Sequence, residues 1–158
     1  GAHITVDLTY GLEVPMAVAE QIKRNYIFGM PGGDNIEAML DNGRTESFER
    51  DAVARVLEPR VDEIAEEIRK NLDESGVRLG SWSNVYLTGG GLALMRGGRE
   101  YLASQLKRPV RAPSPKAAKL NSPIYSSSLG LMDLVFETIE QQTEKSGLFD
   151  RVKGFFKK

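Results

Sequence analysis

The sequence contains no cysteine, which excludes a disulfide framework, a thiolate nucleophile and cysteine-bound structural zinc. Its only histidine, His3, lies at the very start of the chain, where it offers little to classical acid–base catalysis. Charge of one sign is also lacking, since the net charge is −1. Without a basic field we expect no nucleic-acid partner. We predict no catalytic residue and no metal site in this chain.

Long hydrophobic runs are absent as well. The uncharged apolar stretches fall far short of the roughly 18 to 20 residues that span a bilayer. No basic segment followed by an apolar one marks a signal peptide at the N-terminus. The chain opens with Gly1 rather than Met, and we expect the natural protein to extend upstream. Its 158 residues are enough for one compact domain with small appendages.

Hydrophobic periodicity predicts four helices. The first covers residues 15–26, and the second, much longer, covers residues 47–72. Pro59 is expected to kink the long helix or divide it in two, and Gly76 to end it, because glycine favours the left-handed conformation after a helix. The third and fourth helices cover residues 99–106 and 129–143.

Extended segments are predicted between these helices. Asp41, Asn42 and Gly43 supply the positive-φ positions of a tight hairpin. The runs at 85–88 and 108–113 are predicted to be short strands on either side of the third helix. The alternation of strands and helices indicates the α/β class.

Three glycines, Gly89, Gly90 and Gly91, follow the strand at 85–88. Glycine lets a backbone turn sharply and approach a ligand closely, and the helix that follows favours negative or polar groups near its amino end. The pattern is neither a P-loop nor a dinucleotide fingerprint, because no Lys-Ser/Thr follows and the spacing differs from GxGxxG. Taken alone, such a turn is more often structural than functional.

Five blocks, taken together and in this order, resemble the second half of the FtsA family of actin-like bacterial division proteins. The blocks are HITVDLTYGL, AEQIKRNY, LEPRVDEIAEEIRKNL, VYLTGGGLALMRGGREYLASQLKRPV and SPIYSSSLGLMDLV, from His3 to about Val135. The resemblance implies the second lobe of an actin-like (ribonuclease H-like) ATPase fold with a small inserted α+β subdomain. It implies a lobe over residues 1–143, in which a core subdomain (1–12 and 84–143) surrounds an insert of about 13–83. A linker (144–147) and a terminal helix (148–158) follow.

The resemblance also implies a nucleotide site. In the family, the glycine run passes beside the adenine and ribose, which maps to Gly89, Gly90 and Gly91. A carboxylate and a lysine on the AExxK helix approach the ribose hydroxyls and the base, which maps to Glu20 and Lys23. Residues three apart share a helix face, although an exposed Glu–Lys pair without function has the same spacing. The implied cofactor is ATP with Mg²⁺ in the complete protein.

Catalysis is not expected of this chain alone. In the family, two phosphate-binding hairpins and the catalytic acid or glutamine lie upstream of the first block. Phosphoryl transfer depends on clamping the phosphates and positioning a water. We therefore expect this chain to hold at most the adenosine end of ATP and not to hydrolyse it.

The last eleven residues predict an amphipathic helix. On a helical projection the apolar side chains fall within an arc of roughly 120°; they are Leu148, Phe149, Val152, Phe155 and Phe156. Four cations and one carboxylate lie off that arc and give the segment a net charge of +3; the cations are Arg151, Lys153, Lys157 and Lys158. This pattern is typical of a helix that lies on an anionic membrane, and FtsA relatives end in such an anchor. The alternative is a helix that docks on its own core.

Together these features predict a membrane-tethering adaptor. The resemblance implies self-association into filaments, attachment to the cytoplasmic face of the bacterial cell membrane, and FtsZ as the polymer partner, met by the inserted subdomain. One tail should bind reversibly, and several tails in a filament far better. Two alternatives stay open: an MreB-like cell-shape filament protein, and a nucleotide-free structural adaptor of the pilus-assembly type.

Overall fold

The computed structural model describes residues 1–30, 32–78, 80, 83–113 and 122–139. The chain divides into two compact units, Gly1–Ser114 and Pro115–Lys158.

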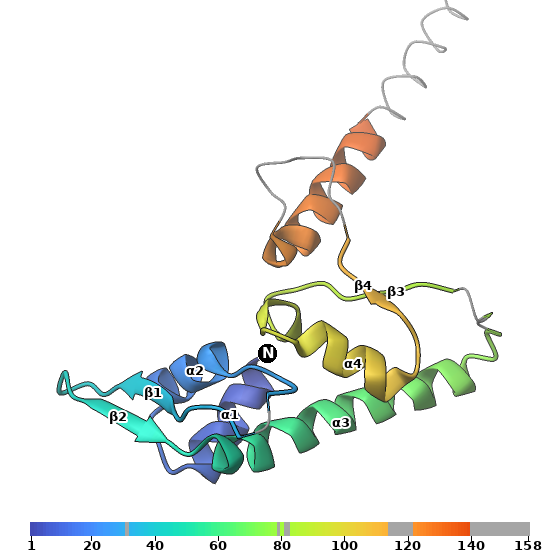
Figure 1. Ribbon diagram of the computed structural model, residues 1–158. Coiled ribbons are helices and arrows are strands. Elements are labelled where there is room, and N and C mark those ends of the chain that lie inside the picture. Colours follow the sequence, from blue (N-terminus) through green and yellow to red (C-terminus); the bar gives the residue numbers. More distant parts are fainter. Residues whose placement is uncertain (31, 79, 81–82, 114–121, 140–158) are drawn as a thin grey trace, which may run out of the picture. The chain divides into compact units, whose positions relative to one another are not determined.

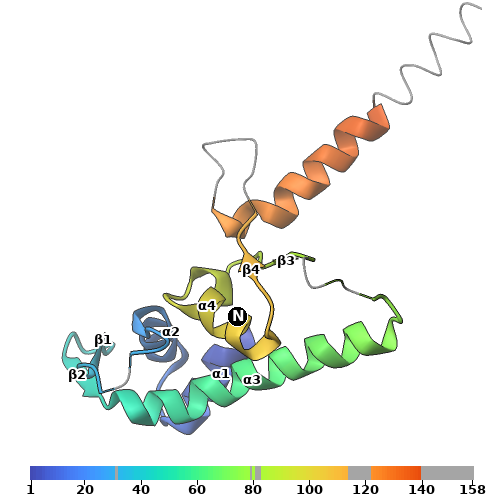
Figure 2. The ribbon, with the colours of Figure 1, turned by 45° about the vertical axis from the view of Figure 1, so that its right-hand side comes forward.

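The first unit combines four α-helices with two short pairs of strands among its described residues (Figures 1 and 2). Both views show α3 running along the unit with α1, α2 and α4 on one side of it. In chain order the elements are α1 (Ala2–Gly11), α2 (Met16–Asn25), β1 (Ile36–Met39), β2 (Thr45–Phe48), α3 (Arg50–Glu74), β3 (Val85–Tyr86), η1 (Leu92–Leu94), α4 (Gly98–Leu106) and β4 (Val110–Arg111).

The predicted first helix and hairpin are confirmed. The helix is α2, whose N-cap is Pro15, the first residue of the predicted range. β1 and β2 pair antiparallel, with Ala38 opposite Glu46. The hairpin turn differs in one respect from the prediction: only Gly43 has a positive φ, of 77°. The side chain of Asn42 instead accepts a hydrogen bond of 3.0 Å from the Arg44 amide, which stabilises the turn without a left-handed conformation at Asn42 itself.

The predicted long helix is confirmed as α3, with two corrections. It begins at Arg50, because Ser47 belongs to β2 and is used in the hairpin. Pro59 lies inside one continuous helix and does not divide it. Gly76 follows the helix with φ of 67°, as expected of a residue that ends it.

The parallel strand pair is shorter than the sequence indicated. We predicted a strand over residues 85–88, but β3 ends at Tyr86 and pairs with β4 through Val85 opposite Val110. The glycine run begins two residues beyond Leu87, and Gly89 takes a φ of 92°, which is incompatible with a regular strand. The predicted helix at 99–106 is confirmed as α4, the connection between the two strands.

Helix α1 was not predicted as an element. Its apolar contacts come from Ile4 and Leu8, which lie four residues apart and are fully buried. That spacing is the helical signal in the segment, and it covers only two positions. The helix packs against both α2 and α3. Its place in the core therefore follows from tertiary packing and could not be predicted from the local sequence.

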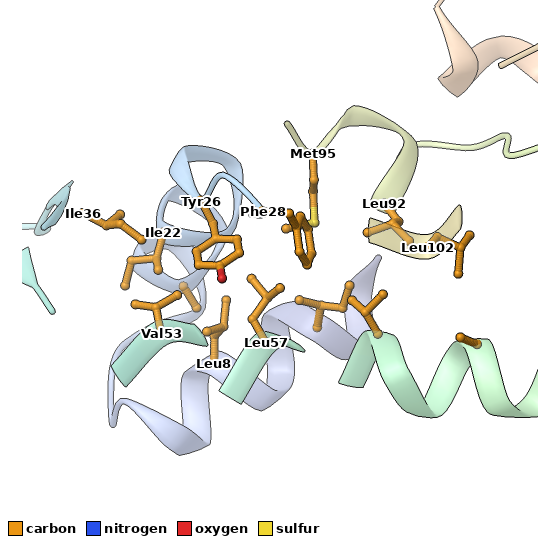
Figure 3. Close-up of a cluster of buried hydrophobic side chains, with 14 of the residues drawn as sticks. Leu8, Ile22, Tyr26, Phe28, Ile36, Val53, Leu57, Leu92, Met95 and Leu102 are labelled. Atoms are coloured by element: carbon orange, nitrogen blue, oxygen red, sulfur yellow. The ribbon is translucent and has the colours of Figure 1, made fainter. Parts of the chain in front are cut away.

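One hydrophobic core holds the first unit together (Figure 3). Side chains from α1, α2 and α3 converge with those around η1 and α4. The largest fully buried side chains are Ile4, Leu8, Ile22, Leu57, Leu102, Val18, Val53 and Val61. The core therefore joins segments that the resemblance assigns to the core subdomain and to the insert.

The second unit contains η3 (Pro123–Tyr125) and a helix over residues 126–139 among its described residues. The predicted fourth helix thus begins three residues earlier than expected, and residues 140–143 lie outside the described part of the chain. Leu129 is partly buried, whereas other large apolar side chains of the helix are at least 49% exposed; they include Leu131, Met132, Leu134, Val135 and Phe136. The predicted stripe of apolar residues therefore lies on a helix, as expected.

Candidate functional site

Glu20 and Lys23 lie on the same face of α2, as their spacing predicted. The Nζ atom of Lys23 is 2.5 Å from Oε2 of Glu20. Lys23 is buried with 5% of its surface exposed, whereas the Glu20 side chain is one-third exposed. The pair is therefore not a solvated surface pair: its cation is inside the protein and its carboxylate reaches the surface.

Thr5 of α1 completes this ion pair. Its hydroxyl donates a 2.7 Å hydrogen bond to Oε2 of Glu20 and accepts one of 2.8 Å from Nζ of Lys23. Thr5 is 3% exposed, so its hydroxyl has been removed from water and depends on these partners. We refer to Thr5, Glu20 and Lys23 as the α1–α2 triad.

The triad fixes the ionisation of Glu20. Burial raises the pKa of the Glu20 carboxyl, but hydrogen bonds from Lys23, Thr5 and Arg24 outweigh burial and lower this pKa to about 2. Arg24, one turn further along α2, donates a 2.9 Å hydrogen bond from its Nε atom to Oε1 of Glu20. Hydrogen bonds to the charged form of a carboxyl favour that form. Glu20 thus presents a permanent, oriented carboxylate at neutral pH.

The glycine run approaches the triad through Gly91 and Gly1. A Cβ on Gly91 would lie 2.9 Å from Cα of Gly1, so only glycine fits where these two backbone segments meet. The carbonyl of Gly1 in turn accepts a 3.5 Å hydrogen bond from Nζ of Lys23. Gly89 supplies the turn, and a Cβ added there would meet none of the described atoms within 4 Å. Gly1 thus links Gly91 to Lys23, and Lys23 is bonded to Glu20.

Sequence reasoning missed Thr5 and Gly1. Thr5 lies one position after the buried Ile4 in a segment that gave only a two-residue helical signal. A polar residue beside the buried face of a helix marks an internal hydrogen-bond network, but its partners on α2 cannot be known without the packing of the two helices.

This arrangement fits a polar ligand with hydroxyl groups. An ionised and partly exposed carboxylate accepts hydrogen bonds from vicinal hydroxyls such as those of a ribose. The glycine run, which contacts Gly1 beside Lys23, lets a flat ring approach the backbone closely. The described residues include no group of three or more Asp, Glu or His side chains placed to hold a metal ion.

The predicted membrane-binding residues, from Leu148 to Lys158, and the linker before them lie outside the described residues. No helix within the described ranges is both long and apolar enough to cross a membrane.

The sequence matches one family of known proteins. The family model described as "Cell division protein FtsA" matches residues 1–130. A protein of that name from Pseudomonas aeruginosa is 30% identical over 142 residues, which cover 84% of this chain and 34% of the relative. The protein of the same name from Bacillus subtilis is 25% identical over 152 residues, which cover 93% of this chain and 34% of the relative. The chain spans about a third of the length of these curated relatives.

Among solved structures, the ethanolamine utilization protein EutJ from Carboxydothermus hydrogenoformans superposes on part of this chain. The TM-score is 0.48 at 20% identity, and the superposition covers 79% of this chain and 34% of EutJ. The family assignment rests on the sequence matches.

Proposed function

This chain belongs to the FtsA family of cell division proteins, and on that premise we propose that it is part of an ATP-binding, actin-like filament protein that tethers FtsZ to the bacterial cell membrane. The family membership favours FtsA over the MreB-like alternative. The nucleotide-free adaptor is the alternative that a binding experiment must separate.

The α1–α2 triad and its contact with the glycine run support nucleotide binding. Glu20 is held ionised and reaches the surface, where it accepts hydrogen bonds from ribose hydroxyls. Lys23 is buried and bonded to Glu20, Thr5 and the Gly1 carbonyl. Its role is therefore to hold Glu20 in place beside the ligand. When bound, ATP with Mg²⁺ supplies the phosphoryl group to be cleaved, and the residues of this chain contribute the adenosine side of the site.

The domain division is part of the proposal. We assign residues 1–12 and 84–143 to a core subdomain and about 13–83 to an inserted subdomain that meets FtsZ. Membrane attachment is assigned to the tail, residues 148–158, on the cytoplasmic face. Self-association places several tails on one membrane, and every tail after the first is held at high effective concentration.

A titration of the ¹⁵N-labelled chain with millimolar ATP tests the nucleotide site. The amide signals of Thr5, Glu20 and Gly91 should shift, and adenosine should shift the same signals, because this chain meets only that end of the nucleotide. Glu20→Gln should weaken both effects, since glutamine has no charge and replaces one of the two accepting oxygens by an NH2 donor. If neither ligand shifts these signals at millimolar concentration, the nucleotide-free adaptor is favoured instead.

A further inference from the structure

The two edges of the β1–β2 hairpin differ in how their backbone groups are paired. Figure 1 shows β1 between α2 and β2. At the outer edge of β1, the side-chain amide of Gln21 donates to the Met39 carbonyl and accepts from the Met39 amide, both at 2.9 Å. Asn25 donates to the Glu37 carbonyl at 3.0 Å. Two side chains of α2 thus take the place of a neighbouring strand.

The outer edge of β2 has no such cover. The bond from the Leu40 amide to the Arg44 carbonyl, 2.8 Å long, shows which backbone groups face β1. Because successive residues alternate in direction, the amide and carbonyl groups of Thr45 and Ser47 face outward. No described residue bonds to these groups, and both residues are exposed. An extended segment placed there would find two donors and two acceptors in strand register.

The charge around this edge selects the kind of segment. Residues 34–51 carry six carboxylates and two guanidinium groups, a net charge of −4. Glu46 lies between the two outward-facing residues and is exposed. If a second copy of this chain paired through the same edge, its negative charges would lie opposite the negative charges of the first copy. Such like-charge pairs are destabilising. A cationic strand would instead gain from the same field.

A charged residue on a short edge strand often serves only to prevent aggregation. The need to prevent aggregation is the same for the outer edges of β1 and β2, but only the edge of β1 is covered by amide side chains. Glu46 prevents pairing with acidic or identical strands and leaves pairing with basic strands open. We propose that the outer edge of β2 is a docking site for an extended, lysine- or arginine-bearing peptide segment, which adds to the hairpin as a third strand.

This docking site does not depend on the nucleotide, the membrane or the identity of the polymer partner. Its probes are synthetic peptides, so its failure would leave the proposed tethering function untouched.

The first test is an NMR titration of the full chain with the acetylated, amidated peptide Lys-Val-Lys-Thr-Lys-Val. The amide signals of Thr45 and Ser47 should shift, and their hydrogen exchange should slow, because both amides become donors to the added strand. A peptide with Glu in place of each Lys should bind at least tenfold more weakly. Equal binding of the two peptides, or no binding of either at millimolar concentration, would overturn the proposal.

A matched pair of variants separates strand addition from attraction by charge alone. Ser47→Pro removes one outward amide donor, and proline is tolerated at an edge whose N–H faces solvent. Ser47→Ala keeps the backbone donor and removes only the side-chain hydroxyl. The lysine peptide should bind Ser47→Pro about threefold to tenfold more weakly than Ser47→Ala, the loss expected for one net hydrogen bond. Unchanged signals of Gln21 and Met39 would show that the hairpin stays folded. Equal affinity for the two variants would contradict strand addition.

Discussion

Thr5 shows at the scale of single residues how a site depends on a side chain that no motif reveals. The spacing of Glu20 and Lys23 and the FtsA resemblance were enough to predict the pair. Neither could reveal that a hydroxyl from another helix accepts from the lysine and donates to the carboxylate. That contact depends on how α1 packs on α2, and helix packing is set by many side chains at once.

Replacing Thr5 by Val tests this link. The change keeps the shape of the side chain and removes its hydroxyl. We expect the free energy of unfolding to fall by about 1–2 kcal/mol, because the buried Lys23 and the one-third exposed Glu20 each lose a hydrogen bond. We also expect the pKa of Glu20 to rise above its value of about 2, since one bond to the ionised form is lost. Urea denaturation and an NMR titration of the Glu20 carboxyl carbon measure both effects.

Thr5→Ser is the control for this change, because it restores the hydroxyl and should restore the low pKa. A Val variant in which neither quantity moves would mean that Thr5 only fills space between the two helices.

Glu20 also makes stability depend on pH. Its folded-state pKa, about 2, lies below its ordinary value of 4.5. The stabilisation of the folded state by ionised Glu20 is therefore fully present above about pH 4.5, and it is lost as the pH falls toward 2. Lys23→Met removes the charged partner, so the variant should lose less stability than the natural chain across this window. Unfolding at a series of pH values measures the two slopes, and parallel slopes would contradict the assignment.

At the scale of elements, the sequence predicted the amphipathic helices, and their described ends lie within three residues of the predicted ones. The stripe of α3 was visible because Val53, Leu57 and Val61 recur at helical spacing, and all three are fully buried. Pro59 was expected to interrupt the helix. It lies on the exposed side of α3, where the missing amide and the ring disturb one hydrogen bond without disturbing the core.

Pro59→Ala tests how much this interruption costs. Alanine restores an amide donor inside the helix and removes the clash of the ring with the preceding turn. Without proline the unfolded chain has more conformational freedom, which lowers the free energy of unfolding by about 0.4–1 kcal/mol and offsets part of this stabilisation. We expect the free energy of unfolding to rise by about 1–2 kcal/mol in urea titrations. A fall would mean that Pro59 stabilises a local geometry that the straight helix cannot adopt.

At the scale of the whole molecule, the actin-like α/β class was predicted correctly from the order of five sequence blocks, and the match of the FtsA family over residues 1–130 confirms it. Composition and periodicity alone indicated only α/β. The subdomain division remains a prediction. The exposed apolar side chains of the helix over residues 126–139 show that an amphipathic pattern predicts a helix without revealing what covers it.

The measurement that tests the proposed tethering function most directly is co-sedimentation with anionic liposomes. Residues 1–158 should pellet, and less so as the salt concentration rises, because cations near anionic lipid contribute about 1 kcal/mol each and are screened by salt. A chain truncated after Ser146 should stay in the supernatant. If the full chain also stays in the supernatant at concentrations that drive self-association, the tail phenylalanines pack on protein and the membrane tether is contradicted.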